Sequence, residues 1–234
     1  MAQPVFSVVI FTAPPPGLSS EGGGATIKID GREVLLRTVE LFLNRDNVKQ
    51  VLVVFPAEQM EEAKRKFGGH FGFSGVKMVT AAGPKWINQI AAAGKAIAPE
   101  ATHVILHDGA RPAVPYSDID ALMTEAEGHD VVALTTPVKS QLVELDEGGG
   151  PVAYQLPSRF AQLVTPQAFA KAKFTAMAES GQDVHASEVT LLKGSPLNQR
   201  LSHSGETSLI KAMINMLPKP KIKAPSSPFE EAQW

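Results

Sequence analysis

The sequence predicts an α/β fold: a Rossmann-like, doubly wound and mostly parallel sheet that carries a β-hairpin arm. Short apolar runs rich in β-branched residues alternate with segments of helical period. The runs are apolar almost throughout, which is typical of strands buried on both faces. Because the alternation repeats along the chain, it indicates strand–helix units of a parallel sheet with helices on both of its faces.

Five apolar runs are the expected strands, since each is too short for a typical helix: 5–11, 51–55, 76–80, 103–107 and 130–135. Helices are expected between them at 33–43, 57–67 and 86–97, with a further one opening near Ser117. The first of these has the one-sided stripe of an amphipathic helix, formed by Leu35, Leu36, Val39, Phe42 and Leu43.

The rhythm changes after residue 135. Residues 141–156 read as two β segments around an Asp-Glu-Gly-Gly-Gly-Pro turn, so we expect a hairpin arm at about 139–160. Such an arm is too thin to be stable alone and should pack on something, for example a second subunit. We expect residues 160–164 to rejoin the sheet.

The C-terminal part returns to helices. A helix is expected from residue 165, with Pro166 near its first turn, and a last helix at 207–217. This organisation predicts a single α/β domain over 1–217. The proline-rich segment 218–234 is expected to be a flexible tail.

The composition limits the classes of function. The chain has 234 residues, of which 44% are hydrophobic and 20% charged, as in globular proteins. The net charge of −2 gives no basic field for nucleic acid or an anionic membrane. The lack of cysteine excludes disulfides and thiolate chemistry. Without an apolar stretch of about 20 residues, we expect a soluble, cytoplasmic protein with no membrane or nucleic-acid partner.

The stretch "VILHDGARP" (104–112) is the main candidate for a site. Asp108 stands at the carboxyl end of an expected strand, the edge where α/β sheets bind ligands. Its carboxylate could hold Mg²⁺ together with ligand phosphates. Gly109 and Ala110 permit close backbone approach, and Arg111 offers a fork of donors for phosphate or carboxylate. The alternative is a structural Asp–Arg pair that stiffens the turn before Pro112. We also expect Asp108→Asn to leave folding intact, because a strand-end carboxylate contributes little to the core.

Residues 104–112 resemble the signature of the methylerythritol phosphate cytidylyltransferases of isoprenoid biosynthesis. Segments 30–42 and 163–169 and the arm match further features of that family in order and spacing. The resemblance implies transfer of a cytidylyl group from CTP to a sugar-alcohol phosphate, with release of pyrophosphate and without a covalent enzyme intermediate. It also implies Mg²⁺ as the cofactor, held by Asp108, and a homodimer in which the arm completes the site.

The same resemblance supplies candidate site residues. Asp108, Arg111 and Lys28 are the catalytic candidates, and Asp108 is the metal ligand. The nucleotide-binding candidates are Ala13, Gly22, Gly23, Gly24, Ala82, Gly83, Asn88, Gly109 and Ala110. The acceptor-binding candidates are Arg111, Ser140, Gln141 and Arg159.

The first loop departs from the family pattern. In an ungapped count, the family's phosphate-binding arginine and lysine fall on Leu18 and Ala25. Prolines 14–16 remove three backbone N–H donors from a loop that should present them to phosphates. Lys28 lies three residues beyond the expected lysine, and a shifted alignment would make it the missing cation. The family's Asn-Ile-Lys falls roughly on residues 201–203, Leu-Ser-His.

Three hypotheses therefore stand. The first is an active cytidylyltransferase that acts on methylerythritol phosphate or on a related polyol phosphate such as ribitol phosphate. The second is a diverged, weakly active or non-catalytic paralogue that acts as a nucleotide-binding or regulatory protein. The third, a dinucleotide-dependent oxidoreductase, is disfavoured because the chain lacks Gly-x-Gly-x-x-Gly and a well-placed ribose-binding acid.

Overall fold

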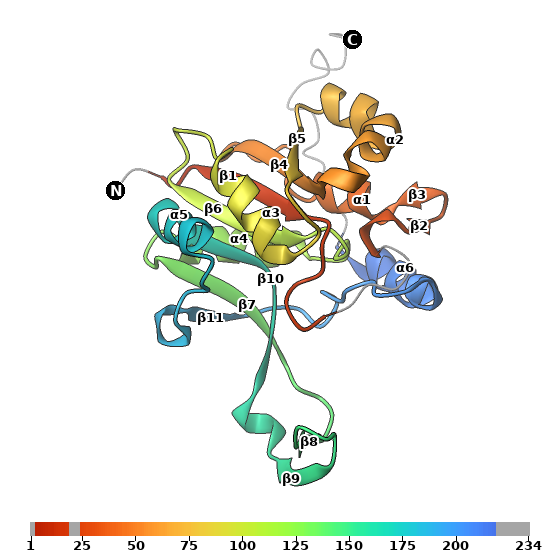
Figure 1. Ribbon diagram of the computed structural model, residues 1–234, viewed down its shortest axis with the longest axis vertical. Helices are drawn as coiled ribbons and strands as arrows, with labels where there is room; N and C mark the ends of the chain where they lie inside the picture. Colours follow the sequence, from red (N-terminus) through yellow and green to blue (C-terminus); the bar gives the residue numbers. More distant parts are fainter. Residues whose placement is uncertain (1–2, 19–23, 219–234) are drawn as a thin grey trace, which may run out of the picture.

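A seven-stranded sheet forms the centre of the protein and confirms the predicted fold class (Figure 1). The computed structural model describes residues 3–18 and 24–218. The strand order is β11-β7-β10-β6-β1-β4-β5. The strands are β1 (Phe6–Phe11), β4 (Val48–Pro56), β5 (Lys77–Ala81), β6 (His103–Asp108), β7 (Val131–Pro137), β10 (Ala161–Ala170) and β11 (Thr190–Lys193). Only β10 among these runs antiparallel to its neighbours, so the sheet is mostly parallel.

Helices cover both faces of the sheet. On one face the core is shared with α1 (Val34–Glu40), α2 (Met60–Phe73) and α4 (Tyr116–Glu125), and on the other with α3 (Trp86–Gly94) and α5 (Lys171–Ser180). Alternate side chains of β1 serve the two cores: Val8 packs in the first and Val9 in the second. Both faces of the central strands are therefore buried, which explains why these runs are apolar throughout.

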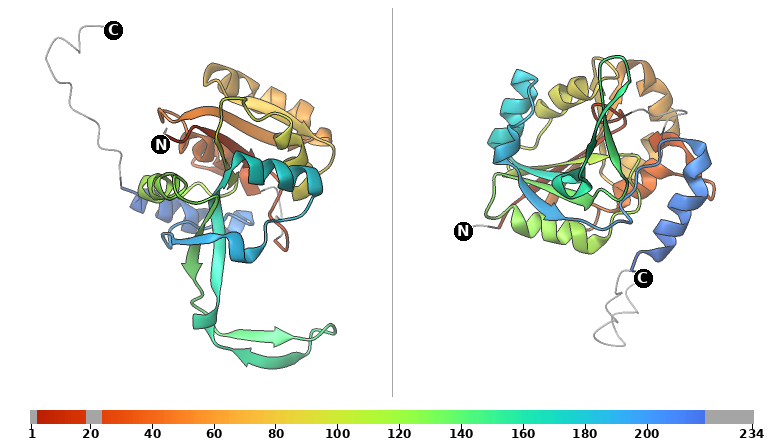
Figure 2. Two further views of the ribbon diagram at one scale, coloured as in Figure 1. Left: turned by 90° about the vertical axis from the view of Figure 1, so that its left-hand side faces the viewer. Right: turned by 90° about the horizontal axis from the view of Figure 1, so that it is seen from below.

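The predicted arm is present. Strands β8 (Leu142–Leu145) and β9 (Pro151–Gln155) pair antiparallel, and Asp146 Oδ1 accepts hydrogen bonds from the Gly148 and Gly150 amides in the turn. Figure 2 shows that the hairpin projects away from the body of the protein.

The predicted helix start at Pro166 is wrong. Strand β10 continues through Pro166, and α5 begins only at Lys171. The register between β10 and β7 shifts between Val164 and Gln167, so Pro166 sits at an irregularity where the ladder requires no N–H donor. The stretch around Pro166 is apolar and compatible with a helix, but it belongs to the sheet because β10 pairs with β6 and β7.

Several short elements were not predicted. Strands β2 (Lys28–Ile29) and β3 (Arg32–Glu33) form a small hairpin on which α6 (Thr207–Met216) packs through Ile29 and Ile210. Strand β11, which was also not predicted, pairs with β7 at the edge of the sheet. Short 3₁₀ turns lie at Gly24–Thr26, Ala57–Gln59, Pro157–Arg159, Ala186–Glu188 and Ser204–Glu206.

The ends of the chain bear on two predictions. The last helix, expected at 207–217, is confirmed as α6, whereas residues 219–234 of the expected tail lie outside the described residues. Across residues 3–18 and 24–218, each helix is too short or too polar to span a bilayer.

His107 is a polar residue buried in the middle of this framework. It lies on β6 with no exposed surface, its ring stands edge-on to Phe42 at 5.1 Å, and its Nε2 is 3.1 Å from the Arg111 carbonyl oxygen. Burial lowers the pKa of His107 from 6.5 to about 3. The imidazole is therefore neutral and donates Nε2–H to that carbonyl.

His107 should make the protein less stable in acid. Its folded pKa lies below its unfolded pKa, so its contribution is complete above pH 6.5 and is lost as the pH falls toward 3. Between pH 7 and pH 5 we expect it to account for a loss of about 2 kcal/mol in the free energy of unfolding. Urea unfolding of wild type and His107→Gln at both pH values measures this. An equal pH-dependent loss in the two proteins would contradict it.

Candidate functional site

The carboxylate of Asp108 is buried in a network of hydrogen bonds. Its side chain ends β6 and is 1% exposed. Oδ2 accepts a hydrogen bond from Arg200 Nε at 2.7 Å, and Oδ1 accepts one from the Ala110 amide at 2.9 Å. Asp108 thus ends its strand as predicted, but two donors close over its carboxylate.

Arg111 lies beside this pair and is also buried. Its Nη1 donates to the Asn198 carbonyl oxygen at 2.9 Å, while its Nε lies 3.9 Å from Asp108 Oδ2 and finds no hydrogen-bond acceptor among the described residues. Burial lowers the pKa of Arg111, and the negative charge of Asp108 opposes that shift. The short hydrogen bond to the Asp108 carboxylate thus comes from Arg200 rather than from Arg111. A structural Asp–Arg pair is therefore present, but its arginine is not the one that the sequence suggested.

Arg200 and Asn198 were not among the predicted site residues. Asn198 is fully buried and donates from Nδ2 to the Thr165 carbonyl oxygen at 2.7 Å, and Thr165 Oγ1 accepts from the Asp108 amide at 3.0 Å. The Leu201 amide donates to the Ala110 carbonyl oxygen at 2.9 Å. Residues 198–201 are therefore fastened directly onto the turn that follows β6.

A signal for these residues was available. The triplet Asn198-Gln199-Arg200 has the asparagine-x-cation spacing of the family's Asn-Ile-Lys, three residues earlier than the ungapped count placed it. In the structure His203, at the position first assigned to the cation, is half-exposed and lies beside Glu206. A shift of three residues would have identified Arg200.

The glycine and alanine after Asp108 are sites of close packing. A Cβ atom on Gly109 would lie 2.9 Å from the Phe11 carbonyl oxygen and 3.2 Å from Ala25 Cβ. The first loop therefore returns to this turn at Ala25, which is 2% exposed. Gly24 begins the same 3₁₀ turn, whereas Gly22 and Gly23 lie outside the described residues.

Other nucleotide-binding candidates meet at the start of α3. Gln89 Oε1 lies 3.1 Å from the Thr12 amide and 3.4 Å from the Ala13 amide and accepts from both. A Cβ on Gly83 would lie 2.6 Å from Asn88 Nδ2, so the Asn88 side chain covers that glycine. The structure thus brings Ala13, Gly83 and Asn88 to one end of α3, with exposed Ala82 in the preceding turn.

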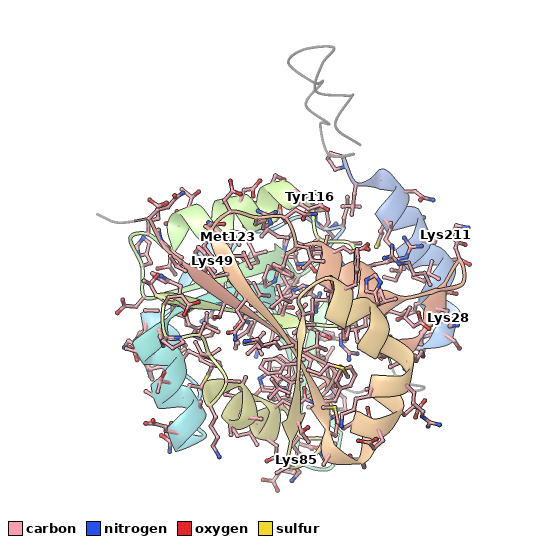
Figure 3. All side chains as sticks on the ribbon, turned by 90° about the horizontal axis from the view of Figure 1, so that it is seen from above. Lys28, Lys49, Lys85, Tyr116, Met123 and Lys211 are labelled. Atoms are coloured by element: carbon pink, nitrogen blue, oxygen red, sulfur yellow. The ribbon has the colours of Figure 1, made fainter. Side chains whose placement is uncertain are left out.

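Lys28 is not brought to Asp108. Its side chain is 57% exposed, and its Nζ lies 3.4 Å from Glu33 Oε1, a carboxylate that Lys66 also approaches at 3.6 Å. Figure 3 shows Lys28 close to Lys211, at the edge formed by the β2–β3 hairpin and α6. The proposed shift of alignment is therefore not supported, because Lys28 is committed to a surface ion pair.

The acceptor-binding candidates Ser140, Gln141 and Arg159 are all exposed. Ser140 and Gln141 precede β8, and Arg159 ends the 3₁₀ turn Pro157–Arg159 that follows β9.

Two cavities flank the first loop. One, of about 400 Å³, lies between the loop and α2 and is lined by Thr12, Ala13, Pro14, Thr26, Phe55, Pro56, Gln59, Glu62, Ala63, Lys66, Phe67 and Pro84. The other, of about 600 Å³, has mostly apolar walls together with Arg111 and Asp183; its further lining includes Pro15, Pro16, Leu18, Trp86 and Thr165. The proline segment therefore separates the two spaces.

These residues do not fit a protein-held Mg²⁺ ion. Both Asp108 oxygens have close donors, and Mg²⁺ requires near-octahedral oxygen ligands with room for its waters. Within the part of the chain that the structure describes, there is no group of three or more histidine, aspartate or glutamate side chains able to hold a metal.

The expectation that Asp108→Asn leaves folding intact is not supported by this geometry. Removal of the carboxylate breaks the buried ion pair with Arg200 and takes away the negative charge beside Arg111, so we expect a loss of about 3–5 kcal/mol in the free energy of unfolding. Asp120→Asn is the matched control. It breaks the ion pair between Asp120 and Arg45, in which the Asp120 side chain is 63% exposed, and it should cost less than about 1 kcal/mol. Urea unfolding of both variants measures the difference, and similar losses would contradict it.

Comparison with known proteins places the chain in a family. The family model of 2-C-methyl-D-erythritol 4-phosphate cytidylyltransferase matches residues 18–200. A protein of that name from Frankia casuarinae is 27% identical over 174 residues, which cover 72% of this chain and 62% of that protein. One from Geobacter metallireducens is 27% identical over 167 residues, covering 67% of this chain and 70% of that protein.

Solved structures agree in fold. The 4-diphosphocytidyl-2C-methyl-D-erythritol synthase of Anaerococcus prevotii has a TM-score of 0.73 at 17% identity, over 91% of this chain and 97% of that one. The cytidylyltransferase of Thermus thermophilus has a TM-score of 0.67 at 21% identity, over 88% and 98%. The match to the Frankia protein spans less than two thirds of that relative's length. The extent of the family match, over residues 18–200, shows that the chain belongs to the 2-C-methyl-D-erythritol 4-phosphate cytidylyltransferase family.

Proposed function

We propose that this protein transfers a cytidylyl group from CTP to 2-C-methyl-D-erythritol 4-phosphate, giving the CDP-alcohol and pyrophosphate. The observation that carries the proposal is that Arg111 and Arg200 converge on Asp108 at the carboxyl end of β6. That edge is where sheets of this kind bind their ligands. Family membership names the reaction.

The chemistry requires positioning and charge neutralisation. An oxygen of the acceptor phosphate forms a bond to the α-phosphorus of CTP, the bond from that phosphorus to the bridging oxygen breaks, and pyrophosphate leaves with the electron pair. No covalent intermediate with the protein is needed. Two guanidinium groups lie beside one carboxylate here, and the planar fork of a guanidinium suits the oxygens of a phosphate.

The nucleotide has a suitable path along the first loop. Residues 12–18 run between the two cavities, and Ala13 and Pro14 line the smaller one beside Lys66. We place the nucleotide along this segment, with its phosphates toward Arg111. No step of the reaction is assigned to a protein-held metal.

A second candidate is a nucleotide-binding relative with little turnover. It is favoured by the loop, in which exposed Leu18 and buried Ala25 occupy the positions of the family's two cations. Each lost transition-state donor costs several kcal/mol of barrier, and about 1.4 kcal/mol is tenfold in rate. The two candidates differ in whether bound CTP is consumed.

We also propose that the arm pairs two copies of the chain. An isolated two-stranded hairpin is marginal in water, yet this one exposes large apolar side chains: Val143, Leu145, Val152, Tyr154, Leu156 and Phe160. A second copy would cover them and would bring Ser140, Gln141 and Arg159 toward the partner's site. The cytoplasmic location and the absence of nucleic-acid and membrane partners stay predictions.

CTP binding and turnover test the proposed function. We expect CTP to bind in calorimetry more tightly than UTP, ATP or GTP, and pyrophosphate to be released only when the acceptor is added. Arg111→Lys keeps the charge but loses the planar fork, so kcat/KM should fall roughly 100-fold. Lys64→Ala, an exposed lysine on α2, is the control and should be unchanged. Binding of CTP without turnover would favour the second candidate, and no binding at millimolar CTP would overturn both.

The arm is tested by the mass of the protein in solution. Light scattering after size exclusion should give twice the chain mass for wild type and the single-chain mass for Tyr154→Glu, whose parent side chain is 86% exposed on β9. Met216→Glu on α6, where the methionine is 68% exposed, adds the same charge and should leave the dimer intact. A monomeric wild type would refute the pairing.

A further inference from the structure

The cation that faces the strand-end acid is supplied by the chain itself. Arg200 Nε lies 2.7 Å from Asp108 Oδ2, and the two side chains are 6% and 2% exposed. A charge-assisted hydrogen bond of this length is roughly twice as strong as one between neutral groups. The position that a metal ion would take beside this acid is therefore already occupied by a positive group.

The residues on both sides of Arg200 are tied to the turn after β6. On one side, Asn198 accepts from Arg111 and donates to the Thr165 carbonyl oxygen; on the other, the Leu201 amide donates to Ala110. These bonds fasten the segment on both sides of Arg200 to the turn after β6. They keep the Arg200 backbone beside Asp108, so that the guanidinium lies within reach of the carboxylate.

The charges of the cluster also oppose a divalent cation. Asp108 faces Arg200 at 2.7 Å and Arg111 at 3.9 Å, so one negative charge already has two positive neighbours. A third positive group would meet two like charges in a buried, weakly screened environment. The burial of Asp108 to 1% exposure leaves no solvent-filled side for a hydrated ion.

We propose that Arg200 stands in the place of a metal at Asp108: the acid is a positioning residue that orients Arg200, and it does not bind Mg²⁺. The orientation of Arg200 toward an incoming phosphate rests on the proposed function, whereas the absence of a metal at Asp108 does not. Any divalent cation that the reaction uses then enters with the phosphates of the nucleotide rather than on this carboxylate.

The test uses Mn²⁺ as the metal probe and the full chain without nucleotide. In ¹⁵N-labelled protein, Mn²⁺ bound at Asp108 would broaden the amide signals of Gly109 and Ala110. We expect these signals to persist up to about 1 mM Mn²⁺. That concentration is well above the dissociation constants with which carboxylate sites of cytosolic proteins bind Ca²⁺. Asp146 is the internal control, because its carboxylate also accepts two backbone amides, from Gly148 and Gly150, but is exposed.

The outcomes are separable. Persistence of the Gly109 and Ala110 signals, or broadening at Asp146 alone, supports the proposal. Saturable broadening at Gly109 and Ala110 at low Mn²⁺ overturns it. The titration contains no CTP. A result that contradicts the proposal about Asp108 therefore says nothing about turnover, and a lack of turnover says nothing about Mn²⁺ binding.

The positioning role has its own readout in the Michaelis parameters of the full reaction. Arg200→Lys should keep a positive charge and recover at least part of the kcat that Arg200→Gln loses, with urea unfolding used to correct for misfolded protein. Equal kcat values in wild type and Arg200→Gln would overturn the role of Arg200. Comparison of Arg200→Lys with Arg200→Gln distinguishes the effect of losing the positive charge from the effect of losing the planar guanidinium.

Discussion

The buried ion pair between Asp108 and Arg200 is the constraint on which the rest of the site depends. Its partners are 92 residues apart in the chain and meet only because residues 198–201 are fastened to the turn after β6. Buried charges are costly unless they are paired and hydrogen-bonded, and here the Ala110 amide donates a further bond to the carboxylate. Around the pair, Thr165 Oγ1 accepts from the Asp108 amide, and Asn198 Nδ2 donates to the Thr165 carbonyl oxygen. The antiparallel strand β10 is joined to this network through Thr165, so the end of the sheet and the C-terminal segment form one unit.

The sequence predicted the framework because the framework follows local rules. The apolar runs at 51–55 and 103–107 lie within β4 and β6, and the glycine-rich turn at 146–150 connects the arm strands as expected. Pro166 misled the prediction, since nothing local shows that a neighbouring strand tolerates a residue without an N–H donor. Arg200 was missed because the ungapped count placed the family's cation three residues later, at His203. The triplet at 198–200 carries the right spacing, but nothing local shows which carboxylate, 92 positions earlier, its arginine contacts.

In the first loop, a side chain of the protein accepts hydrogen bonds from backbone N–H groups that could otherwise bind a phosphate. Loops of this kind bind phosphates through backbone N–H groups. Here Gln89, which is fully buried, accepts from both the Thr12 and Ala13 amides, and the following three residues are prolines. The described start of the loop is therefore stabilised by the protein itself. Lys28, the one nearby cation that an alignment shift offered, is paired with Glu33 on the surface.

The two halves of the site have consequently diverged to different degrees. The strand-end half retains its acid and holds two guanidinium groups next to it, which suits a phosphate of the acceptor. The loop half has Leu18 and Ala25 where the family resemblance implies cations for the triphosphate. Donors that act on the leaving pyrophosphate lower the barrier rather than strengthen the binding of the acceptor. Relative to family members with an intact loop, the changes in this chain should therefore lower kcat much more than they raise the KM for the polyol phosphate.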